Sequence, residues 1–576
     1  MASWRNQTLT SCLIAIAFLV VLLTPSAGGQ HKSPPPLSST HPAKEVAAST
    51  GNEACQSCHA AIYKSYLLTA MARASGAAAD GLLPGDFIHT ASDVHYRVYE
   101  ENGTAWMSFE RTTEPVIQGK RELLYYIGSG KRGRTYLFSV AGFVFEVPIN
   151  WYAQKQVWDM APAYQAVRAT PMNLPALPGC LSCHTSDAVR PTAGTDNKYT
   201  LPLFAHAGIT CERCHGAGAA HVSAAGRGPI VNPEKLRPAL RDAVCMQCHL
   251  EGNIAIEQPG RSLDEFEPGE DLAEYVHYYV SNGSGEQEVR ALGQSEALAQ
   301  SVCKRKSGDK MWCGSCHDPH SSPKAEERVA SYRAKCLTCH GEAFGAKHHT
   351  EQLDCTTCHM PRVSSADVAH TQATDHRILR LPRMPLLAME PAANARLVRF
   401  PQEVAAGVPA ADAGTENARD LALAWETVEQ SGSRSAAPEA ERYLRKALAE
   451  QPKDAALLSG LAFVEIQRGA FDKAGALYRQ ALEIDPNLSD AAGNLGVIEA
   501  RAGHTEEAER LWNAAFARAP GRSAIGMNLA RISCGEGAFD KARVYVSRVL
   551  EFNPDLALAL TLQKQLSADP PKCGAR

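Results

Sequence analysis

Apolar residues follow several distinct patterns along this chain, and the first pattern is an unbroken run near the N-terminus. Cys12 to Leu23 are all apolar, Arg5 precedes them, and the small residues Ser26 to Gly29 follow. This order is typical of a secretory signal peptide. The run is shorter than the roughly 20 residues of a membrane-spanning helix. We therefore predict a signal peptide over residues 1–28 and a periplasmic or otherwise extracytoplasmic location, with an uncleaved signal anchor as the alternative.

A second pattern, the alternation of apolar and polar residues, predicts β-strands. Val94 to Tyr99 and Thr104 to Phe109 flank Asn102-Gly103, which is a strong signal for a tight hairpin. Thr135 to Ile149 predicts two more strands around an Ala-Gly pair. We expect a small antiparallel β insert at about residues 86–150, which serves either as a cover or as a docking or substrate surface.

A third pattern repeats with a period of 34 residues in the C-terminal part of the chain. The positions that keep the period are Pro452, Pro486, Pro520 and Pro554, Gly469, Gly503 and Gly537, Ala440, Ala474, Ala508 and Ala542, and Leu461, Leu495 and Leu529. Small residues where two helices touch, and Pro after the second helix, resemble tetratricopeptide repeats. We expect an all-α solenoid over residues 417–570, whose concave surface docks a protein partner.

Two linkers are expected to separate these parts. Residues 29–50 are rich in Pro and Ser and predict a flexible linker, and residues 389–416 predict a second linker. The part between them, residues 51–388, is then one region. The net charge of −4 gives no basic field, so a nucleic acid is not an expected partner.

The motif CxxCH occurs seven times in this region and uses fourteen of the eighteen cysteines. The sites are Cys55, Cys58 and His59; Cys180, Cys183 and His184; Cys211, Cys214 and His215; Cys245, Cys248 and His249; Cys313, Cys316 and His317; Cys336, Cys339 and His340; and Cys355, Cys358 and His359.

The chemistry of covalent haem explains this motif. Two thiols three positions apart can bond to the two vinyl groups of one haem, and the next imidazole can bind its iron. A single CxxC could instead be a redox dithiol or half of a zinc site. Neither a zinc site nor a disulfide framework requires His after every pair, so we predict seven covalently attached haems c.

Four cysteines lie outside the motifs. Cys12 would leave with the signal peptide, and Cys303, Cys534 and Cys573 are expected to be free thiols.

The supply of further histidines decides whether each iron can have a second imidazole ligand. Ten histidines from Cys55 to the end of the haem region lie outside the motifs. Their number is sufficient for every iron to have two histidine ligands, which makes the iron low-spin and suited to electron transfer. No iron is therefore required to keep an open coordination position. The candidates for the second ligand are His89, His206, His221, His320, His349, His370 and His376. His348 and His349 are adjacent, so only one of the two is expected to serve, and the sequence assigns no pairs.

Three stretches carry a resemblance to a known family. GITCERCHGAGAAHV (208–222), CHDPH (316–320) and CHMPR (358–362) resemble multihaem c-type cytochromes related to the tetrahaem cytochrome c-554 of ammonia oxidisers, and proteins with doubled CxxCH motifs. Residues 125–138 and 146–152 look like bacterial proteins that join such a region to tetratricopeptide repeats. The resemblance implies bis-His haems in close-packed pairs and a role in moving electrons. The seven motifs and the β insert depart from the tetrahaem pattern.

The expected fold class is α+β and multidomain. A haem-packed, mostly irregular and helical cytochrome region with a small antiparallel β insert precedes the all-α solenoid. The leading hypothesis is an exported electron-transfer protein whose repeats dock a redox protein partner. The alternative is an oxidoreductase that acts on a small nitrogen or sulfur compound at one open haem, and a third is a redox-responsive scaffold. We assign no catalytic residue, and a membrane contact only through an uncleaved signal anchor.

Haem is expected to form much of the apolar core between Pro171 and Pro361, so this region should fold only with haem attached. In protein produced without haem attachment, limited proteolysis should therefore degrade this region and leave the helical repeats intact. A compact, protease-resistant haem region in the haem-free chain would contradict the prediction.

Overall fold

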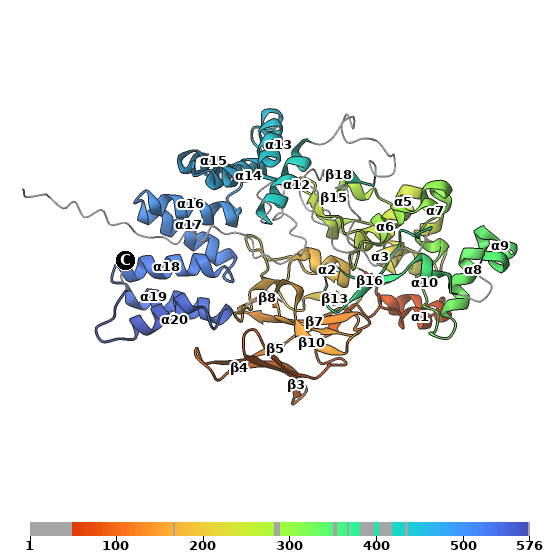
Figure 1. Cartoon of the computed structure of the whole chain (residues 1–576), viewed down its shortest axis with the longest axis horizontal. Helices are drawn as coiled ribbons and strands as arrows, with labels where there is room; N and C mark the ends of the chain where they lie inside the picture. The colour runs from red at the N-terminus through yellow and green to blue at the C-terminus, as the bar shows by residue number, and fades with distance from the viewer. Residues whose placement is uncertain are drawn as a thin grey trace, which may run out of the picture. The chain divides into compact units, whose positions relative to one another are not determined.

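The computed structural model describes residues 49–164, 168–281, 289–348, 354–365, 368–380, 397–401, 418–431 and 436–573 (Figure 1). The predicted signal peptide, most of both predicted linkers and His349 lie outside the described residues. The chain divides into two compact units, with the boundary between Leu488 and Ser489.

The first sheet contains the predicted hairpin. It has four antiparallel strands in chain order, β2 (Gly85–His89), β3 (Val94–Glu101), β4 (Thr104–Arg111) and β5 (Ile117–Leu123). Asn102 and Gly103, which join β3 to β4, have φ of 53° and 77°, as a tight hairpin turn requires. The alternating side chains Val94, Tyr96, Val98, Met107 and Phe109 are buried on one face. The hairpin prediction is therefore confirmed.

The sequence pattern predicted only part of a second, larger sheet: the two strands around the Ala-Gly pair are confirmed as β7 (Gly133–Val140) and β8 (Phe143–Glu146). Its other strands are β1 (Ser75–Ala77), β6 (Tyr125–Ile127) and β11 (Leu174–Pro175), with β9 (Ile149–Tyr152) and β10 (Val157–Met160) alongside. The outer strands have two to four residues each, which is too short for alternation to be visible. The β region thus extends from Ser75 to Pro175.

Short helices and strands carry the rest of the N-terminal region. They are η1 (Asn52–Cys55), α1 (Ala60–Tyr66), η2 (Pro162–Tyr164), α2 (Pro178–His184), β12 (Ser186–Ala188), β13 (Phe204–His206), α3 (Glu212–His215), α4 (Ala219–Ser223), η3 (Pro233–Lys235), α5 (Pro238–His249), β14 (Ile254–Glu257), η4 (Leu263–Glu265), η5 (Leu272–Glu274), β15 (Val276–Ser281), α6 (Gln294–Gln300), α7 (Val302–Ser307), η6 (Gly308–Lys310), η7 (Cys313–Ser315), α8 (Arg328–His340), α9 (Glu342–His348), α10 (Cys355–His359), β16 (Arg362–Ser364), β17 (Gln372–Thr374) and β18 (Leu397–Phe400).

The C-terminal part consists of helices in antiparallel pairs. They are α12 (Ala418–Gln430), α13 (Ala437–Glu450), α14 (Ala455–Gln467), α15 (Phe471–Ile484), α16 (Ser489–Arg501), α17 (Thr505–Arg518), α18 (Ser523–Gly535), α19 (Phe539–Phe552) and α20 (Ala557–Leu566). Gly469, Gly503 and Gly537 have φ of 75°, 87° and 76° at the turn inside each pair, a conformation that favours glycine. The 34-residue period is therefore a helix–turn–helix repeat, as predicted.

The first helices of this part share an apolar core with a sheet of the cytochrome region. β14, β15 and β18 form a three-stranded antiparallel sheet. Ile256 and Tyr279 from this sheet pack in one buried cluster with Leu421 of α12 and Leu457 of α14. β18 comes from the segment predicted as a linker, and it pairs with β15.

A buried polar network accompanies this shared core. The carboxylate of Asp420, which is fully buried, accepts hydrogen bonds from His277 Nδ1 at 2.7 Å and from Gln258 Nε2 at 2.7 Å. Arg419 is also buried and pairs with Asp420 at 2.9 Å and with Asp454 at 2.6 Å. Because buried charges are tolerated only when they are paired and hydrogen-bonded, this network specifies one arrangement of α12 against the sheet.

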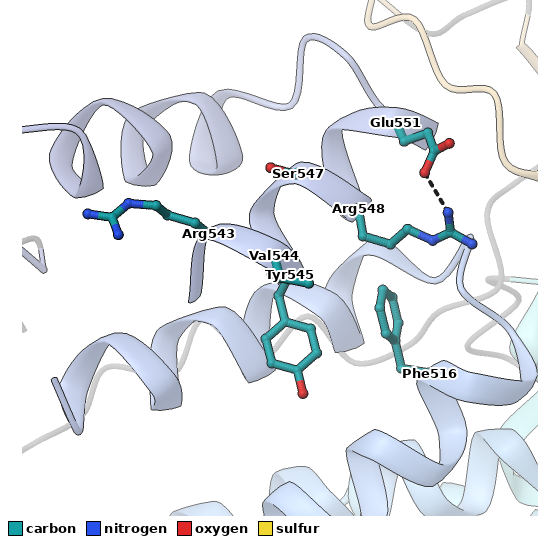
Figure 2. Close-up of a pocket in the computed structure, with 7 residues that line it drawn as sticks. All are labelled: Phe516, Arg543, Val544, Tyr545, Ser547, Arg548 and Glu551. Atoms are coloured by element: carbon teal, nitrogen blue, oxygen red, sulfur yellow. Dashed lines mark hydrogen bonds and ion pairs between the residues drawn. The ribbon is translucent and has the colours of Figure 1, made fainter. Parts of the chain in front are cut away.

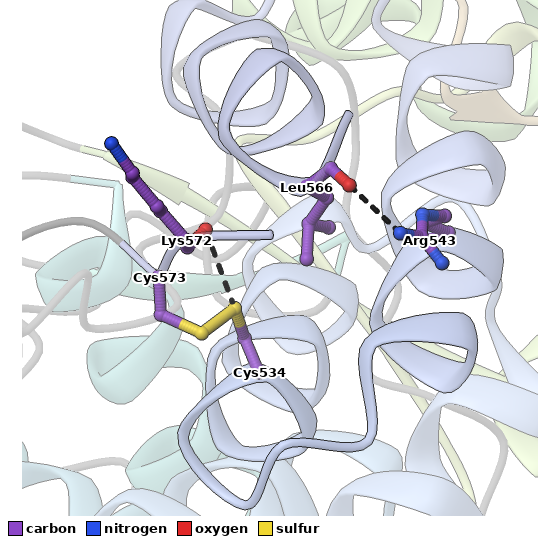
Figure 3. Close-up of a disulfide and its surroundings, with 5 residues drawn as sticks. All are labelled: Cys534, Arg543, Leu566, Lys572 and Cys573. Carbon is purple, nitrogen blue, oxygen red and sulfur yellow. Dashed lines mark hydrogen bonds between the residues drawn. A yellow bond between two sulfur atoms is a disulfide. The ribbon is translucent and has the colours of Figure 1, made fainter. Parts of the chain in front are cut away.

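One expectation about the cysteines is wrong. Cys534 of α18 and Cys573 near the C-terminus form a disulfide with a Cα–Cα distance of 5.7 Å (Figure 3), whereas both were expected to be free. The bond ties the segment after α20 to α18, 39 residues earlier. Cys303 is free, as expected.

Within the described part of the chain, none of the helices combines the length and the apolar character that crossing a membrane requires.

Replacing Asp420 with Ala should destabilise the joint between α12 and the sheet, because Arg419 and His277 would lose a buried partner. The expected loss is about 3–5 kcal/mol in the free energy of unfolding, measured by denaturant titration followed by far-ultraviolet circular dichroism. The matched control is Glu439→Ala, whose pair with Arg442 is exposed and contributes about 0–1 kcal/mol. Equal losses in the two variants would refute a structural role for the network.

Candidate functional site

Every CxxCH motif lies on a helical turn. Five of the seven form the end of a helix, since α2, α3, α5, α8 and α10 each end at the motif histidine. In the motifs at Cys55 and Cys313, the His backbone N–H donates to the first Cys carbonyl at 2.9 Å, which also closes a helical turn. Residues i and i+4 lie on one face of such a turn. The first thiol and the imidazole therefore face the same side, as attachment to one flat macrocycle requires.

Glycine ends two of these helices directly after the histidine. Gly216 and Gly341 both have a φ of 72°, which side chains with a Cβ rarely adopt. The chain can therefore turn away after the imidazole and leave the space beside it open.

Thiols from different motifs lie in contact. Cys55 contacts Cys211, Cys183 contacts Cys248, Cys245 contacts Cys313, and Cys336 contacts Cys355. Weaker electrostatic interactions join Cys214 to Cys245 and Cys316 to Cys339. These interactions join all seven motifs into one cluster, in which the fourth motif interacts with the second, third and fifth, although 120 residues separate the first motif from the second along the chain.

Burial disfavours the thiolate form of Cys211 and of Cys180. Burial raises the pKa of the Cys211 thiol to about 12, and the charge of Cys55 adds to the shift. Burial also raises the pKa of Cys180 to about 12, with a further contribution from Glu146. A thioether does not titrate, so covalent attachment keeps these buried sulfur atoms uncharged at any pH.

The imidazoles are held with a ring nitrogen directed at the protein backbone. His215 Nδ1 lies 2.8 Å from the Val231 carbonyl oxygen, and His359 Nδ1 lies 2.6 Å from that of Leu379. An Nδ1–H donated to a carbonyl leaves Nε2 as the lone-pair nitrogen, which is the usual state of a metal-bound histidine. Burial also lowers the pKa of His184, His215, His249 and His317, and thus favours the neutral ring that binds a metal.

Glu212, which sequence reasoning missed, holds two motifs together. Its carboxylate accepts hydrogen bonds from the backbone N–H of Thr50 at 2.8 Å and of Gly218 at 2.7 Å. Burial acts to raise the pKa of Glu212, but hydrogen bonds from Ser49, Gly218 and other donors outweigh it and hold the pKa below its usual value. Asn52 adds a second link, because its side-chain oxygen accepts from the Cys211 N–H at 2.9 Å. In the sequence, the only signal for this role of Glu212 is its position between the two cysteines of a motif.

Three of the predicted second ligands lie beside motif residues. His320 and His376 have their rings next to those of His215 and His317. His206 lies beside Gly51, just before the first motif, where a Cβ on the glycine would approach the ring to 2.8 Å.

The other candidates lie elsewhere. His221 is on α4, and its Nδ1 lies 2.9 Å from the Gly228 carbonyl oxygen. His89 contacts Ser92 at the end of β2, and His370 contacts Asp159 next to β10 at 2.6 Å. His349 falls outside the described residues. The structure does not bring His89 or His370 next to a motif histidine among the residues it describes.

The packing of the last three motifs tests whether the residues fit a haem. Among the described residues from 292 to 372, no apolar side chain is buried, and α8 has no buried residue. By contrast, each helix from α12 to α20 buries apolar residues. A folded region needs an apolar core, and porphyrins attached to the clustered thiols would supply one. The residues therefore fit covalent haem.

An open groove lies on the helical repeats, away from any motif residue in sequence. Figure 2 shows its lining, with Phe516 from α17 and Val544, Tyr545 and Arg548 from α19. Val544 is 67% exposed, and Arg548 pairs with Glu551 at 2.6 Å. Ser547 and Glu551 also line the groove, but the Glu551 carboxylate is paired with Arg548, so we assign the groove no chemistry.

The chain combines clustered CxxCH turns, whose thiols contact those of other motifs, with helix–turn–helix repeats. This combination defines a multihaem c-type cytochrome joined to a repeat array. Comparison with protein families agrees. Residues 152–216 match the family of cytochrome c554 and c-prime, and residues 305–345 match the doubled CXXCH motif. Residues 434–495 and 499–566 match the tetratricopeptide repeat. The chain is a multihaem cytochrome c fused to tetratricopeptide repeats.

Comparison with curated proteins gave no match. Among solved structures, the chain is similar to MamA from Desulfovibrio magneticus RS-1, with 16% identity, 27% of this chain and 86% of that chain covered, and a TM-score of 0.24. It is also similar to PilF of Pseudomonas aeruginosa, with 25% identity, 26% and 67% coverage, and a TM-score of 0.24.

Proposed function

We propose that this protein is an exported heptahaem cytochrome that passes electrons along a series of closely packed, mostly bis-His haems, and that its repeats dock a redox protein partner. The observation that carries the proposal is the contact between thiols of different motifs. A c-type haem is bonded to its thiols at the edge of the porphyrin. Thiols in contact therefore bring the edges of two porphyrins close together, which favours electron transfer between them.

The histidines support low-spin iron. His215, His317 and His359 each have a second imidazole nearby. Iron with two imidazole ligands has no free position for a substrate, so it is suited to carrying electrons rather than to catalysis.

The joint with the repeats supports a docking role. A partner bound to a loosely tethered array would have no defined position relative to the haems. Here α12 is packed and hydrogen-bonded to the sheet of β14, β15 and β18, so the first repeat is held against the cytochrome region.

Export is supported by two features of different kinds. The sequence of residues 1–28 has the pattern of a signal peptide. The Cys534–Cys573 disulfide is of a kind that persists in oxidising compartments outside the cytoplasm. We therefore place the mature protein in the periplasm or an equivalent space.

The haem content is tested on the exported protein by intact mass and haem-stained gel. We expect the mass to exceed that of the mature chain by the mass of seven haems, and the absorption spectrum to be that of low-spin haem. Cyanide, nitrite and hydroxylamine should cause no shift. A high-spin haem that responds to nitrite or hydroxylamine would favour the oxidoreductase instead, and a colourless protein would refute haem attachment.

The docking role is tested by reversing one exposed charge on the repeats. Arg531→Glu on α18, the first helix of its pair, should slow the exchange of electrons between the haems and an extract of the native host. It should leave the haem spectra and the reduction by dithionite unchanged. The control is Arg510→Glu on α17, a second helix, where Arg510 is exposed and pairs with Glu507. Equal rates for both variants and the unaltered chain would contradict docking at this face.

A further inference from the structure

Three motif histidines face a second histidine that comes from a different part of the chain. The ring of His320 lies 5.9 Å from that of His215, measured between ring centres, with the planes 10° apart. The rings of His376 and His317 are 6.2 Å apart at 34°, and those of His348 and His359 are 5.9 Å apart at 25°.

These separations match two imidazoles that share one metal. A histidine nitrogen binds a metal at about 2.0–2.1 Å and lies about 1.1 Å from its ring centre, so two rings on opposite sides of one iron are about 6 Å apart. Direct contact between nearly parallel rings would instead bring atoms to about 3.5–4.0 Å. Rings that are almost parallel with centres 5.9 Å apart overlap little face to face, so stacking alone explains them poorly.

The hydrogen bonds of these rings leave the correct nitrogen for a metal. Nδ1 of His215, His359 and His376 lies 2.8, 2.6 and 2.9 Å from a backbone carbonyl oxygen. Nε2 of these three has no hydrogen-bond partner among the residues that the structure describes. In two of the pairs, the opposite histidine also has its Nδ1 beside a polar group. Nδ1 of His320 lies 3.4 Å from the Asp318 carboxylate, and Nδ1 of His317 lies 3.4 Å from the Tyr332 hydroxyl.

We propose that His320 is the second axial ligand of the iron at Cys211–His215, His376 that of the iron at Cys313–His317, and His348 that of the iron at Cys355–His359. The assignment rests on the haem attachment proposed above and adds the identity of each ligand. It also decides between the adjacent His348 and His349 in favour of His348.

Two of the three assignments join segments that are distant in the sequence. His320 follows the fifth motif but serves the third haem, and His376 follows the seventh motif but serves the fifth. The segment around His317 thus gives a ligand to one iron and receives a ligand for its own. Each of these irons takes at least one ligand from residues 292–372, where the described residues bury no apolar side chain.

The test uses the exported, haem-loaded full chain with single substitutions, read out by electron paramagnetic resonance and near-infrared magnetic circular dichroism. His320→Ala, His376→Ala and His348→Ala should each convert one of the seven haems from low-spin to high-spin. His320→Met, His376→Met and His348→Met should keep that haem low-spin but give it a His–Met signature and a higher reduction potential. The Met variants preserve six ligands, so they remain informative if an Ala variant fails to fold.

Two controls are built into the chain. His349→Ala, next to His348, and His95→Ala, whose ring pairs with Asp86 on the first sheet at 2.7 Å, should leave all spin states unchanged. A change with His349→Ala but not with His348→Ala overturns that assignment. Variants that carry seven porphyrins by mass and remain fully bis-His overturn the pairing while leaving the proposed function intact. Absence of porphyrin from the unaltered protein would refute the proposed function itself.

Discussion

The contact between cysteine thiols of different motifs is the constraint on which the cytochrome region depends. Separate segments meet at Cys55 and Cys211, and at Cys183 and Cys248. Burial raises the pKa of the Cys211 thiol and so disfavours its charged form. Around the last three motifs, the described residues from 292 to 372 bury no apolar side chain that could form a core. Covalent porphyrins resolve both difficulties, because thioethers are uncharged and the macrocycles supply apolar surface. Folding and cofactor attachment are then one process, and the close spacing that favours electron transfer follows from it.

The sheet of β14, β15 and β18 connects this cluster to the repeats. Neighbouring residues of β15 point to opposite faces. Tyr278 is buried close to Cys183 and Cys248, whereas His277 donates to Asp420 of α12. Arg399 of β18 donates to the other nitrogen of His277 at 2.6 Å. One strand therefore contacts the attachment sites on one side and the first repeat on the other. A partner held by that repeat would have a defined position relative to the second and fourth haems.

The helical repeats are stabilised differently. Ala440, Ala474, Ala508 and Ala542 are fully buried where paired helices meet, and Trp512 donates from its indole nitrogen to the Gly493 carbonyl at 2.9 Å. This part has its own side-chain core and needs no cofactor. The Cys534–Cys573 disulfide adds a covalent restraint at its end. The chain thus joins a region whose core is supplied by a cofactor to one whose core is supplied by side chains.

The sequence by itself determined whatever depends on neighbouring residues. CxxCH places two thiols and an imidazole on one helical turn, Asn-Gly specifies the β3–β4 turn, and a 34-residue period specifies paired helices. Only the tertiary structure decided which motifs touch, that Glu212 and Asn52 hold two of them together, and that Cys534 reaches Cys573. It also brought His320 to His215 and formed β18 from a segment that reads as a linker. These contacts join residues far apart in the chain, and their geometry depends on how every intervening segment packs, which local patterns do not encode.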